Sequence, residues 1–413
     1  MDDLRRSLGA FDPDATLPSA PDPWAEQPMP KVRSGPPWAM AEMIAAEPAL
    51  AVRVGRQVVA DSAASGLAGM VREAVAAGKP VVVTGCGTSE HAAMAVVAVL
   101  RDALRRAGLP ATTLSSAQAF ELALDPPDSG LVIGCSHEGG TAATIAALDE
   151  AAARGARTAL ITASSHSPAA AGRDLVVATR ELDQSWCHTV GYVSPITVAV
   201  ATADLLVGDA PQPGAAGRRL GAGIEAAHAG AETGDAAPDA VIAASVAPLG
   251  HLLVAASGAD RISARELALK VEEASWLPAT SRDLETVLHG HLPATGRDTG
   301  LIVIQLERNG LAARTKRARQ GLRAAATLGV RTAAILGAAA AEQIPADLTP
   351  GGRIVVPESD EVPGAAGALL GAATPIQLVT LAIAEARGTN PDPIRRDDPA
   401  YLRAAELADD PEG

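Results

Sequence analysis

Two short loops combine glycines with hydroxyl-bearing residues, and each directly follows a run of apolar residues. The first spans residues 85–89 (Gly-Cys-Gly-Thr-Ser), and the second spans residues 136–141 (Ser-His-Glu-Gly-Gly-Thr). Glycines permit a tight strand-to-helix turn, Thr88 and Ser89 can cap the next helix, and a helix N-terminus attracts anions. Either loop alone could be an ordinary turn. Together, on neighbouring strands, they predict one crevice for an acidic ligand.

Several histidines and cysteines lie near these loops. His91 follows the first loop and is equally consistent with a ligand contact or a surface position, whereas His188 is expected at the mouth of the site. Cys86 and Cys135 are explained by packing of small residues. His291 stands two residues from His289, but a metal site would need further ligands, so no metal is expected.

The elements around the loops alternate between strand and helix. Apolar runs at 80–85, 131–135, 157–162 and 175–177 predict strands, and residues 90–107 and 141–154 predict helices between them. Two further helices are expected at 38–58 and 61–77. This alternation predicts βαβ units and a parallel sheet, which binds ligands at the carboxyl ends of its strands.

The same order of elements then repeats. Apolar runs at 252–258, 301–304, 332–336 and 354–356 follow in the same order. The shift is 172 residues from Gly85 to Ser257 and 171 residues from Ile133 to Ile304, so one offset holds over about 50 residues. The predicted fold class is α/β with two duplicated domains, each a parallel sheet flanked by helices. The predicted boundaries are an extended arm (1–36), a first domain (37–210), a linker with some helix (211–238), a second domain (239–388) and a C-terminal tail (389–413).

Composition excludes several classes of protein. The net charge of −14 and pI near 5.0 argue against a nucleic-acid partner. The three cysteines are widely spaced and the first residues lack an apolar stretch, which predicts a cytoplasmic protein with reduced thiols. Residues 364–384 are long enough to span a membrane, but they contain Pro375, Gln377 and several glycines. We expect a loop and then a buried helix there, and no membrane partner.

At this point a family resemblance becomes visible. The two loops resemble the phosphosugar loops of SIS (sugar isomerase) domains, as in the isomerase half of glucosamine-6-phosphate synthase. In the second repeat, residues 264–273 resemble the family's active-site helix and residues 288–291 its His-Gly loop. Residues 191–195 match a third loop loosely, and residues 375–378 and 388–392 resemble the C-terminal helix and turn. The resemblance spans about residues 38 to 396 and implies a tandem pair of SIS domains.

The resemblance also implies roles for individual residues. The ligand's phosphate, or its substitute, would be held by Thr88, Ser89, Ser136, His137 and Thr141. The other expected substrate-binding residues are Gly87 and Glu138 in the two loops and Ser194 near the sugar. Glu266, Lys270 and Glu273 would line the reacting end, with Glu273 moving a proton between C1 and C2. His289 would open the sugar ring from a partner subunit, which implies a homodimer with shared sites. No cofactor is expected.

Lys270 and Glu273 illustrate how much depends on the resemblance. They are three residues apart and therefore neighbours on one helix face, so the lysine can tune the carboxylate. By spacing alone, a solvated ion pair of small energetic value is the better interpretation. The family match favours a catalytic pair instead.

Three departures from the family limit the functional prediction. No glutamine-hydrolysing domain or N-terminal cysteine nucleophile is found, and no lysine follows Lys316, so the synthase's Schiff base is not expected. Glu138 stands where the phosphate loop usually has serine, and a carboxylate beside a phosphate is unfavourable unless it points away or pairs with an arginine.

What remains is a phosphosugar aldose–ketose isomerase or an amino-sugar-6-phosphate deaminase, working through an enediol or enolamine. Both remain open, because the same residues could serve each reaction. The alternatives are an Amadori-type sugar–amine deglycase and a sugar-phosphate sensor without turnover. A transcriptional sensor is disfavoured because residues 1–60 lack a basic recognition helix.

Overall fold

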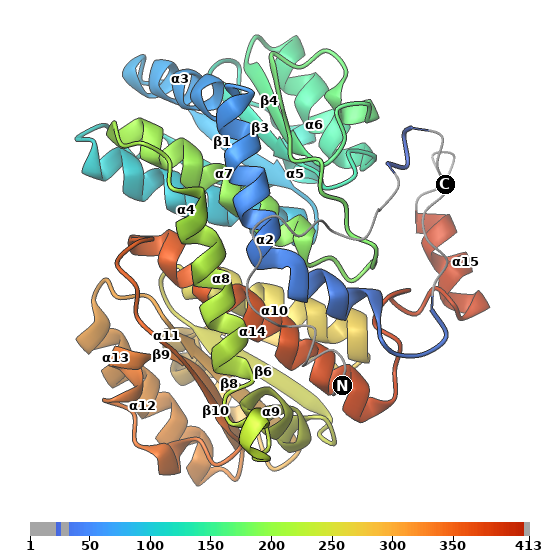
Figure 1. Cartoon of the computed structure of the whole chain (residues 1–413), viewed down its shortest axis with the longest axis vertical. Coiled ribbons are helices and arrows are strands. Elements are labelled where there is room, and N and C mark those ends of the chain that lie inside the picture. The colour runs from blue at the N-terminus through green and yellow to red at the C-terminus, as the bar shows by residue number, and fades with distance from the viewer. Residues whose placement is uncertain (1–21, 26–32, 409–413) are drawn as a thin grey trace.

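The computed structural model describes residues 22–25 and 33–408, and it contains two parallel sheets flanked by helices (Figure 1). The predicted α/β class is confirmed. Most of the expected arm at 1–36 and the last residues of the expected tail lie outside the described residues. The boundaries between the domains stay a prediction.

The first sheet is built from the strands expected around the two glycine loops. Its order is β2-β1-β3-β4-β5, with every pair parallel. The strands are β1 (Val81–Gly85), β2 (Leu114–Gln118), β3 (Leu131–Cys135), β4 (Arg157–Thr162) and β5 (Leu175–Ala178); the helices are α3 (Ala63–Ala76), α4 (Thr88–Arg106), α5 (Ala119–Leu124), α6 (Ala142–Ala153) and α7 (Val190–Val207).

The second sheet repeats this plan. Its order is β10-β9-β8-β6-β7, which matches the first sheet when read from the other end. The strands are β6 (His251–Ala256), β7 (Ala279–Asp283), β8 (Thr299–Gln305), β9 (Arg331–Gly337) and β10 (Arg353–Val356); the helices are α9 (Pro238–Val246), α10 (Asp260–Ser275), α11 (Leu284–Thr286), α12 (Leu311–Thr327) and α13 (Ala338–Ala341).

Two strands were not predicted, and both lie at a sheet edge. β2 pairs only with β1, and β7 pairs only with β6. Their sequences, Leu-Ser-Ser-Ala-Gln and Ala-Thr-Ser-Arg-Asp, are largely polar and partly exposed. A continuous apolar run is typical of strands buried on both faces, and the side chains of these two strands are only partly buried. Hydrophobic pattern therefore could not reveal them.

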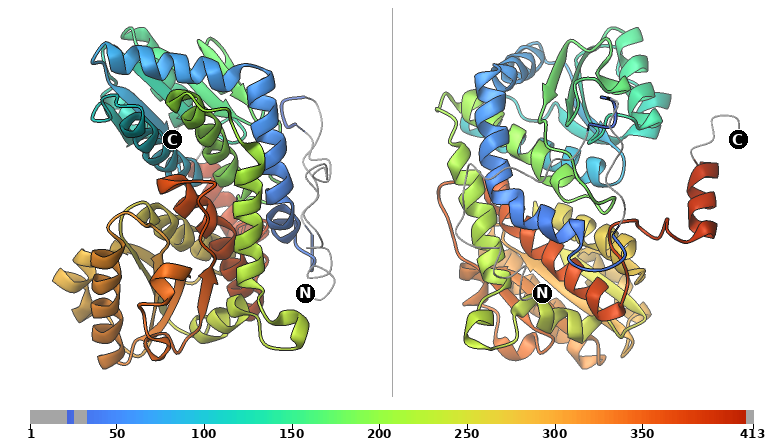
Figure 2. Two further views of the ribbon diagram at one scale, coloured as in Figure 1. Left: turned by 60° about the vertical axis from the view of Figure 1, so that its left-hand side comes forward. Right: turned by 45° about the vertical axis from the view of Figure 1, so that its right-hand side comes forward.

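Three long helices cross between the sheets and form the spine of the molecule (Figure 2). They are α2 (Ala39–Ala60), α8 (Pro213–Ala227) and α14 (Gly364–Arg387), and α8 packs against both of the others. Residues 213–227, inside the expected linker, are thus a packed helix. A Cβ at Gly55 would lie 2.9 Å from Pro213, and one at Gly223 would lie 2.3 Å from Thr374, so these glycines permit the close approach.

The expected loop before the buried helix at 364–384 was wrong. Residues 364–387 form one helix, α14, with Pro375 inside it, and residues 365–384 are all buried. α7 and α14 both have the length and hydropathy of a membrane span, but 78% and 100% of their apolar windows are buried inside the protein. Both therefore serve as core helices of this fold. A separate helix, α15 (Pro399–Ala408), buries none of its residues.

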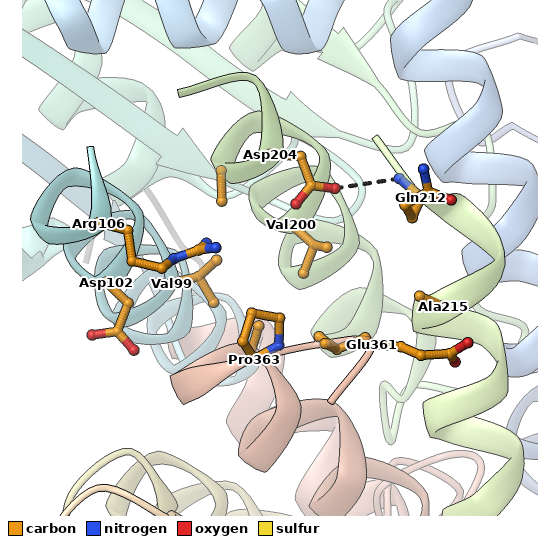
Figure 3. Close-up of a pocket in the computed structure, with 12 residues that line it drawn as sticks. Val99, Asp102, Arg106, Val200, Asp204, Gln212, Ala215, Glu361 and Pro363 are labelled. Atoms are coloured by element: carbon orange, nitrogen blue, oxygen red, sulfur yellow. Dashed lines mark hydrogen bonds between the residues drawn. The ribbon is translucent and has the colours of Figure 1, made fainter. Parts of the chain in front are cut away.

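A small cavity lies where α4, α7 and α8 meet the start of α14 (Figure 3). It is lined by residues that include Arg106, Asp204, Gln212 and Glu361. The Asp204 carboxylate accepts a hydrogen bond from the Gln212 N–H at 3.3 Å, and burial raises the pKa of Asp204. None of the predicted site residues lines this cavity, so it is separate from the candidate site.

Candidate functional site

The centre of the candidate site is one face of α10. Glu266, Lys270 and Glu273 are spaced by four and three residues, so their side chains lie on the same side of the helix. The Lys270 ammonium lies 2.5 Å from Oε2 of Glu273 and 3.9 Å from Oε1 of Glu266. Lys270 and Glu266 are buried, whereas Glu273 keeps 23% of its side chain exposed. Glu273 is therefore the member of the trio that a ligand can reach.

The first glycine loop meets this face of α10. The Thr88 hydroxyl donates to Oε1 of Glu266 at 3.3 Å, and Nδ1 of His91 lies 2.7 Å from Oε2. The helix α4 is capped by Gly87 at φ +56°, with no side-chain hydrogen bond, so the expected capping by Thr88 and Ser89 was wrong. Because glycine adopts this backbone at little cost, the Thr88 hydroxyl is free to contact α10.

The second loop is held from behind by a buried aspartate. The N–H of Asp183 donates to Nε2 of His137 at 2.8 Å, which leaves the ring hydrogen of neutral His137 on Nδ1. The Asp183 carboxylate lies 3.6 Å from the same nitrogen, beyond hydrogen-bonding distance, and instead accepts the N–H groups of Thr189, Val190 and Gly191. This carboxylate thus anchors the N-terminus of α7 beside the loop.

A pair of neighbouring residues connects the second loop to α10. The ring of His188 lies 5.0 Å from the ring of His137, and burial together with the nearby His137 and Lys270 holds its pKa well below the usual value. The adjacent thiol of Cys187 donates a hydrogen bond to the Glu273 carboxylate, and burial raises the pKa of Cys187 well above its usual value. His188 and Cys187 therefore link the second loop to the Glu273 carboxylate.

The charges of the α10 trio tune one another. Burial raises the pKa of Glu273 above that of an ordinary glutamate, and the neighbouring Lys270 ammonium opposes part of this effect. Burial alone would lower the pKa of Lys270, but the carboxylates of Glu273 and Glu266 outweigh it, so Lys270 stays protonated. A carboxylate with a raised pKa is a stronger base, which suits abstraction of a proton from carbon.

The remaining loop residues differ in their accessibility. Ser136 is buried, Ser89 is half-buried, and Thr141 is exposed at the N-cap of α6. Ser194 is 1% exposed and its hydroxyl has no partner among the described residues. The carboxylate of half-buried Glu138 likewise makes no hydrogen bond or ion pair within the described part of the chain, and so it pairs with no arginine there.

His289 is the predicted residue that this single chain does not bring to the site. Its side chain is 67% exposed, and its Nδ1 lies 2.9 Å from the Glu285 carboxylate and 3.3 Å from the Arg317 guanidinium. His291, two residues on, lines a separate surface pocket with Arg261, Arg265 and Arg282. Delivery of His289 by a partner subunit stays a prediction.

Sequence reasoning missed three buried residues around the site. Asp183 and Cys187 lie in the stretch before α7, where no regular pattern is available, and the start of α7 at Val190 was not predicted either. Glu47, in α2, accepts a hydrogen bond from Gln377 of α14 at 2.9 Å, and burial raises its pKa well above the usual value. Nothing in the local sequence distinguishes Glu47 from a surface glutamate.

Comparison with known proteins identifies the first of the two sheets. Residues 76–207 match the family model of the SIS domain. This part of the chain is therefore similar to SIS domains. It contains both glycine loops, from Gly85 to Thr141, and the whole of α7. The matched part thus contains the hydroxyl-bearing loops of the candidate site, whereas α10, which carries Glu266, Lys270 and Glu273, lies outside it.

Solved structures share the fold of both halves. The chain is similar to the C-terminal domain of glucosamine-fructose-6-phosphate aminotransferase from Francisella tularensis, with a TM-score of 0.71, 17% identity and coverage of 88% of this chain and 99% of that one. It is also similar to tagatose-6-phosphate ketose/aldose isomerase from Escherichia coli, with a TM-score of 0.68 and 17% identity, over 89% of this chain and 98% of that one. Glucosamine-6-phosphate deaminase from Thermotoga maritima is similar with a TM-score of 0.62 and 17% identity, over 86% of this chain and 97% of that one. No curated protein matches in sequence.

Proposed function

We propose that this chain is a sugar isomerase or amino-sugar deaminase in which Glu273 transfers a proton between C1 and C2 of the substrate. The reaction would pass through an enediol or an enolamine. The observation that carries the proposal is the accessible Glu273 carboxylate, whose pKa is raised. It is paired with buried Lys270 at 2.5 Å and accepts a hydrogen bond from the Cys187 thiol. An ordinary surface ion pair would have neither the burial nor the contacts with the SIS domain.

The surrounding residues support this chemistry. Glu266 is held by Thr88 and His91, so it keeps α10 in register with the SIS-domain loops. Lys270 would stabilise the negative charge that develops on the substrate oxygen. His289 from a partner subunit would carry the proton to the ring oxygen, and the active unit would be a homodimer. The named activities of two structural neighbours, a ketose/aldose isomerase and a deaminase, are in keeping with this proposal.

The pH dependence follows from the sign of the Glu273 pKa shift. The base must be ionised to accept a proton, and burial raises its pKa above 4.5. Proton exchange should therefore decline on acidification at a higher pH than an ordinary glutamate would give. A sensor without turnover would show no exchange at any pH.

The test is exchange at carbon in deuterated water. The protein is incubated with fructose 6-phosphate, glucosamine 6-phosphate and the unphosphorylated sugars, and C1/C2 exchange and ammonia release are followed by NMR. Ammonia release identifies a deaminase, and exchange without ammonia identifies an isomerase. Glu273→Gln should lower the rate by about 10²- to 10⁴-fold. Glu272→Gln, an exposed neighbour, is the control. Unchanged turnover in Glu273→Gln would refute the catalytic role.

A further inference from the structure

Three arginines line a surface pocket of about 290 Å³ beside the first half of α10. Arg261 and Arg265 belong to α10, and Arg282 belongs to the edge strand β7. The lining of this arginine pocket also includes Ser281, Asp283 and His291. Among the described residues, no member of the candidate site lines it, so the arginine pocket is a separate place on the molecule.

The positive charge of the arginine pocket is only partly balanced by the protein. Nε of Arg261 lies 2.6 Å from Oδ1 of Asp283, the one carboxylate that the described residues place in the lining. Arg265 and Arg282 have no carboxylate within ion-pair distance in the described part of the chain. Nη1 of Arg265 lies 3.9 Å from Sδ of Met94, and Nη1 of Arg282 donates to the carbonyl of the preceding residue at 2.7 Å. Two guanidinium charges therefore stay unpaired there, although the whole chain carries a net charge of −14.

The side chains of the arginine pocket offer more hydrogen-bond donors than acceptors. A guanidinium carries five N–H donors in a planar fork, which matches the paired oxygens of a phosphate or a carboxylate. Arg265 and Arg282 are exposed, and each uses one N–H group in the contact that it makes with the protein. The Ser281 hydroxyl and the His291 ring make no hydrogen bond with the described residues. The pocket therefore suits a ligand whose oxygens accept hydrogen bonds and carry negative charge.

The arginines of α10 are particular to the second half of the chain. At the 172-residue offset of the repeat, Arg261 corresponds to Ser89 and Arg265 corresponds to Ala93, both in α4. The two halves share their strand order, so the fold itself does not require basic residues at these positions. A hollow lined by charges of one sign raises the local concentration of ligands of the opposite sign. In an acidic chain, such a hollow is the place where an anion would gather.

We propose that the arginine pocket is a second ligand site, and that it binds a small dianion through the guanidinium groups of Arg265 and Arg282. Two unpaired positive charges match a ligand with about two negative charges, which a phosphate group or a dicarboxylate carries near neutral pH. Arg261, held by Asp283, forms part of the wall. The volume is near the lower end of the range for ligand sites, which suits a small metabolite. The inference is independent of the proposed reaction, because no residue of the candidate site takes part.

Titration calorimetry of the full chain at low salt, with inorganic phosphate, succinate and acetate, tests the site. Phosphate, succinate or both should bind, and the tighter of the two identifies the ligand as a phosphate or a dicarboxylate. Acetate has a single negative charge and should bind at least about tenfold more weakly. Arg265→Gln and Arg282→Gln should each lower the affinity for the dianion by about tenfold, and the double variant should lower it further. Added salt should weaken binding to the unaltered chain, because exposed charges are screened.

The matched control is Arg323→Gln, which removes an exposed arginine of α12 outside the pocket and should leave the affinity unchanged. Thermal unfolding of each variant checks that the fold is intact, as expected at exposed positions. The inference is overturned if neither phosphate nor succinate binds at about 10 mM. It is also overturned if the affinity survives in the double variant, because the anion then binds elsewhere. Carbon exchange is a separate readout, so a protein that binds the dianion without exchange refutes the proposed reaction alone.

Discussion

The carboxyl edges of the two sheets differ in chemistry although their strand order is the same. Thr88, the first residue of the helix after β1, corresponds to Asp260, the first residue of the helix after β6, at the 172-residue offset of the repeat. Oδ2 of Asp260 accepts the N–H groups of both Leu306 and Glu307 at 2.8 Å. The Arg314 guanidinium also donates a hydrogen bond to the Ser257 hydroxyl at 2.5 Å. The second edge is therefore closed by the protein's own side chains.

The first edge lacks such a closure. The Thr88 hydroxyl is too short to bridge to the next loop and contacts Glu266 instead. The backbone N–H groups from Glu138 to Thr141 find no acceptor among the described residues. The loop that corresponds to Ser136–Thr141 in the second half begins at Glu307, whose carboxylate accepts the N–H of Asn309. Equivalent positions in the two halves therefore differ. In the second half, side-chain carboxylates of the protein accept backbone N–H groups, whereas in the first half such N–H donors are left for a ligand.

In this comparison, α10 is the element that the second half contributes to the candidate site of the first half. Lys270→Met tests this contribution and has the largest expected effect. Removing the ammonium leaves two carboxylates facing each other in a buried place, so we expect a loss of about 3–5 kcal/mol in the free energy of unfolding. The pKa of Glu273 should rise further, because the group that opposes burial is gone. The acid limb of kcat/KM should therefore move to higher pH.

Denaturant unfolding and pH–rate profiles measure both effects of Lys270→Met. Lys79→Met, at an exposed position before β1, is the control and should change neither. An unmoved acid limb in Lys270→Met would show that Glu273 is not the base.

Thr88→Asp introduces into the first half the residue type that Asp260 provides at the equivalent position of the second half. The new carboxylate would lie next to Glu266, where the threonine oxygen is 3.3 Å from Oε1, and like charges would displace α10 from the loop. We expect sugar affinity to fall by about 100-fold, roughly the effect of 2.7 kcal/mol. Thr88→Ser keeps the hydroxyl and should bind within a few-fold of the unaltered protein. Equal binding by the Asp and Ser variants would contradict the open-edge interpretation.

Asp260→Asn has the smallest expected effect and tests the closed edge. Burial raises the pKa of Asp260 to about 7, above its value in an unfolded chain, so the folded state holds this proton more tightly. The unaltered protein should therefore lose stability as the pH rises from about 4 to 7, by about 1–3 kcal/mol. The Asn variant can keep both N–H bonds through its oxygen and should not show this loss.

Thermal or urea unfolding of the two proteins at pH 4 and pH 8 measures this difference. The proteins should be equally stable at pH 4, and the Asn variant should be more stable at pH 8. Parallel stability curves would mean that Asp260 is already ionised throughout this range. Carbon exchange should be similar in both, because Asp260 lies outside the candidate site.

The sequence alone predicted the strands with continuous apolar runs, the repeat and the two glycine loops. These features are local or periodic, so the order of residues is enough to show them. Hydrophobic pattern failed at β2 and β7, because edge strands can be polar, and at α14, where full burial permits a helix with proline inside it. Asp183 also escaped prediction, because its partners are set by the path of the chain before α7.

Spacing along the chain placed Glu266, Lys270 and Glu273 on one helix face, but it did not say what that face meets. Only the tertiary structure brought α10 to Thr88 and His91, some 175 residues earlier in the chain. It likewise placed Trp24 on Gly140 and left Glu138 without a partner among the described residues. These contacts depend on the packing of distant elements, which no local pattern encodes. The glycine loops were thus legible in the sequence, whereas the charge around them was decided by the fold.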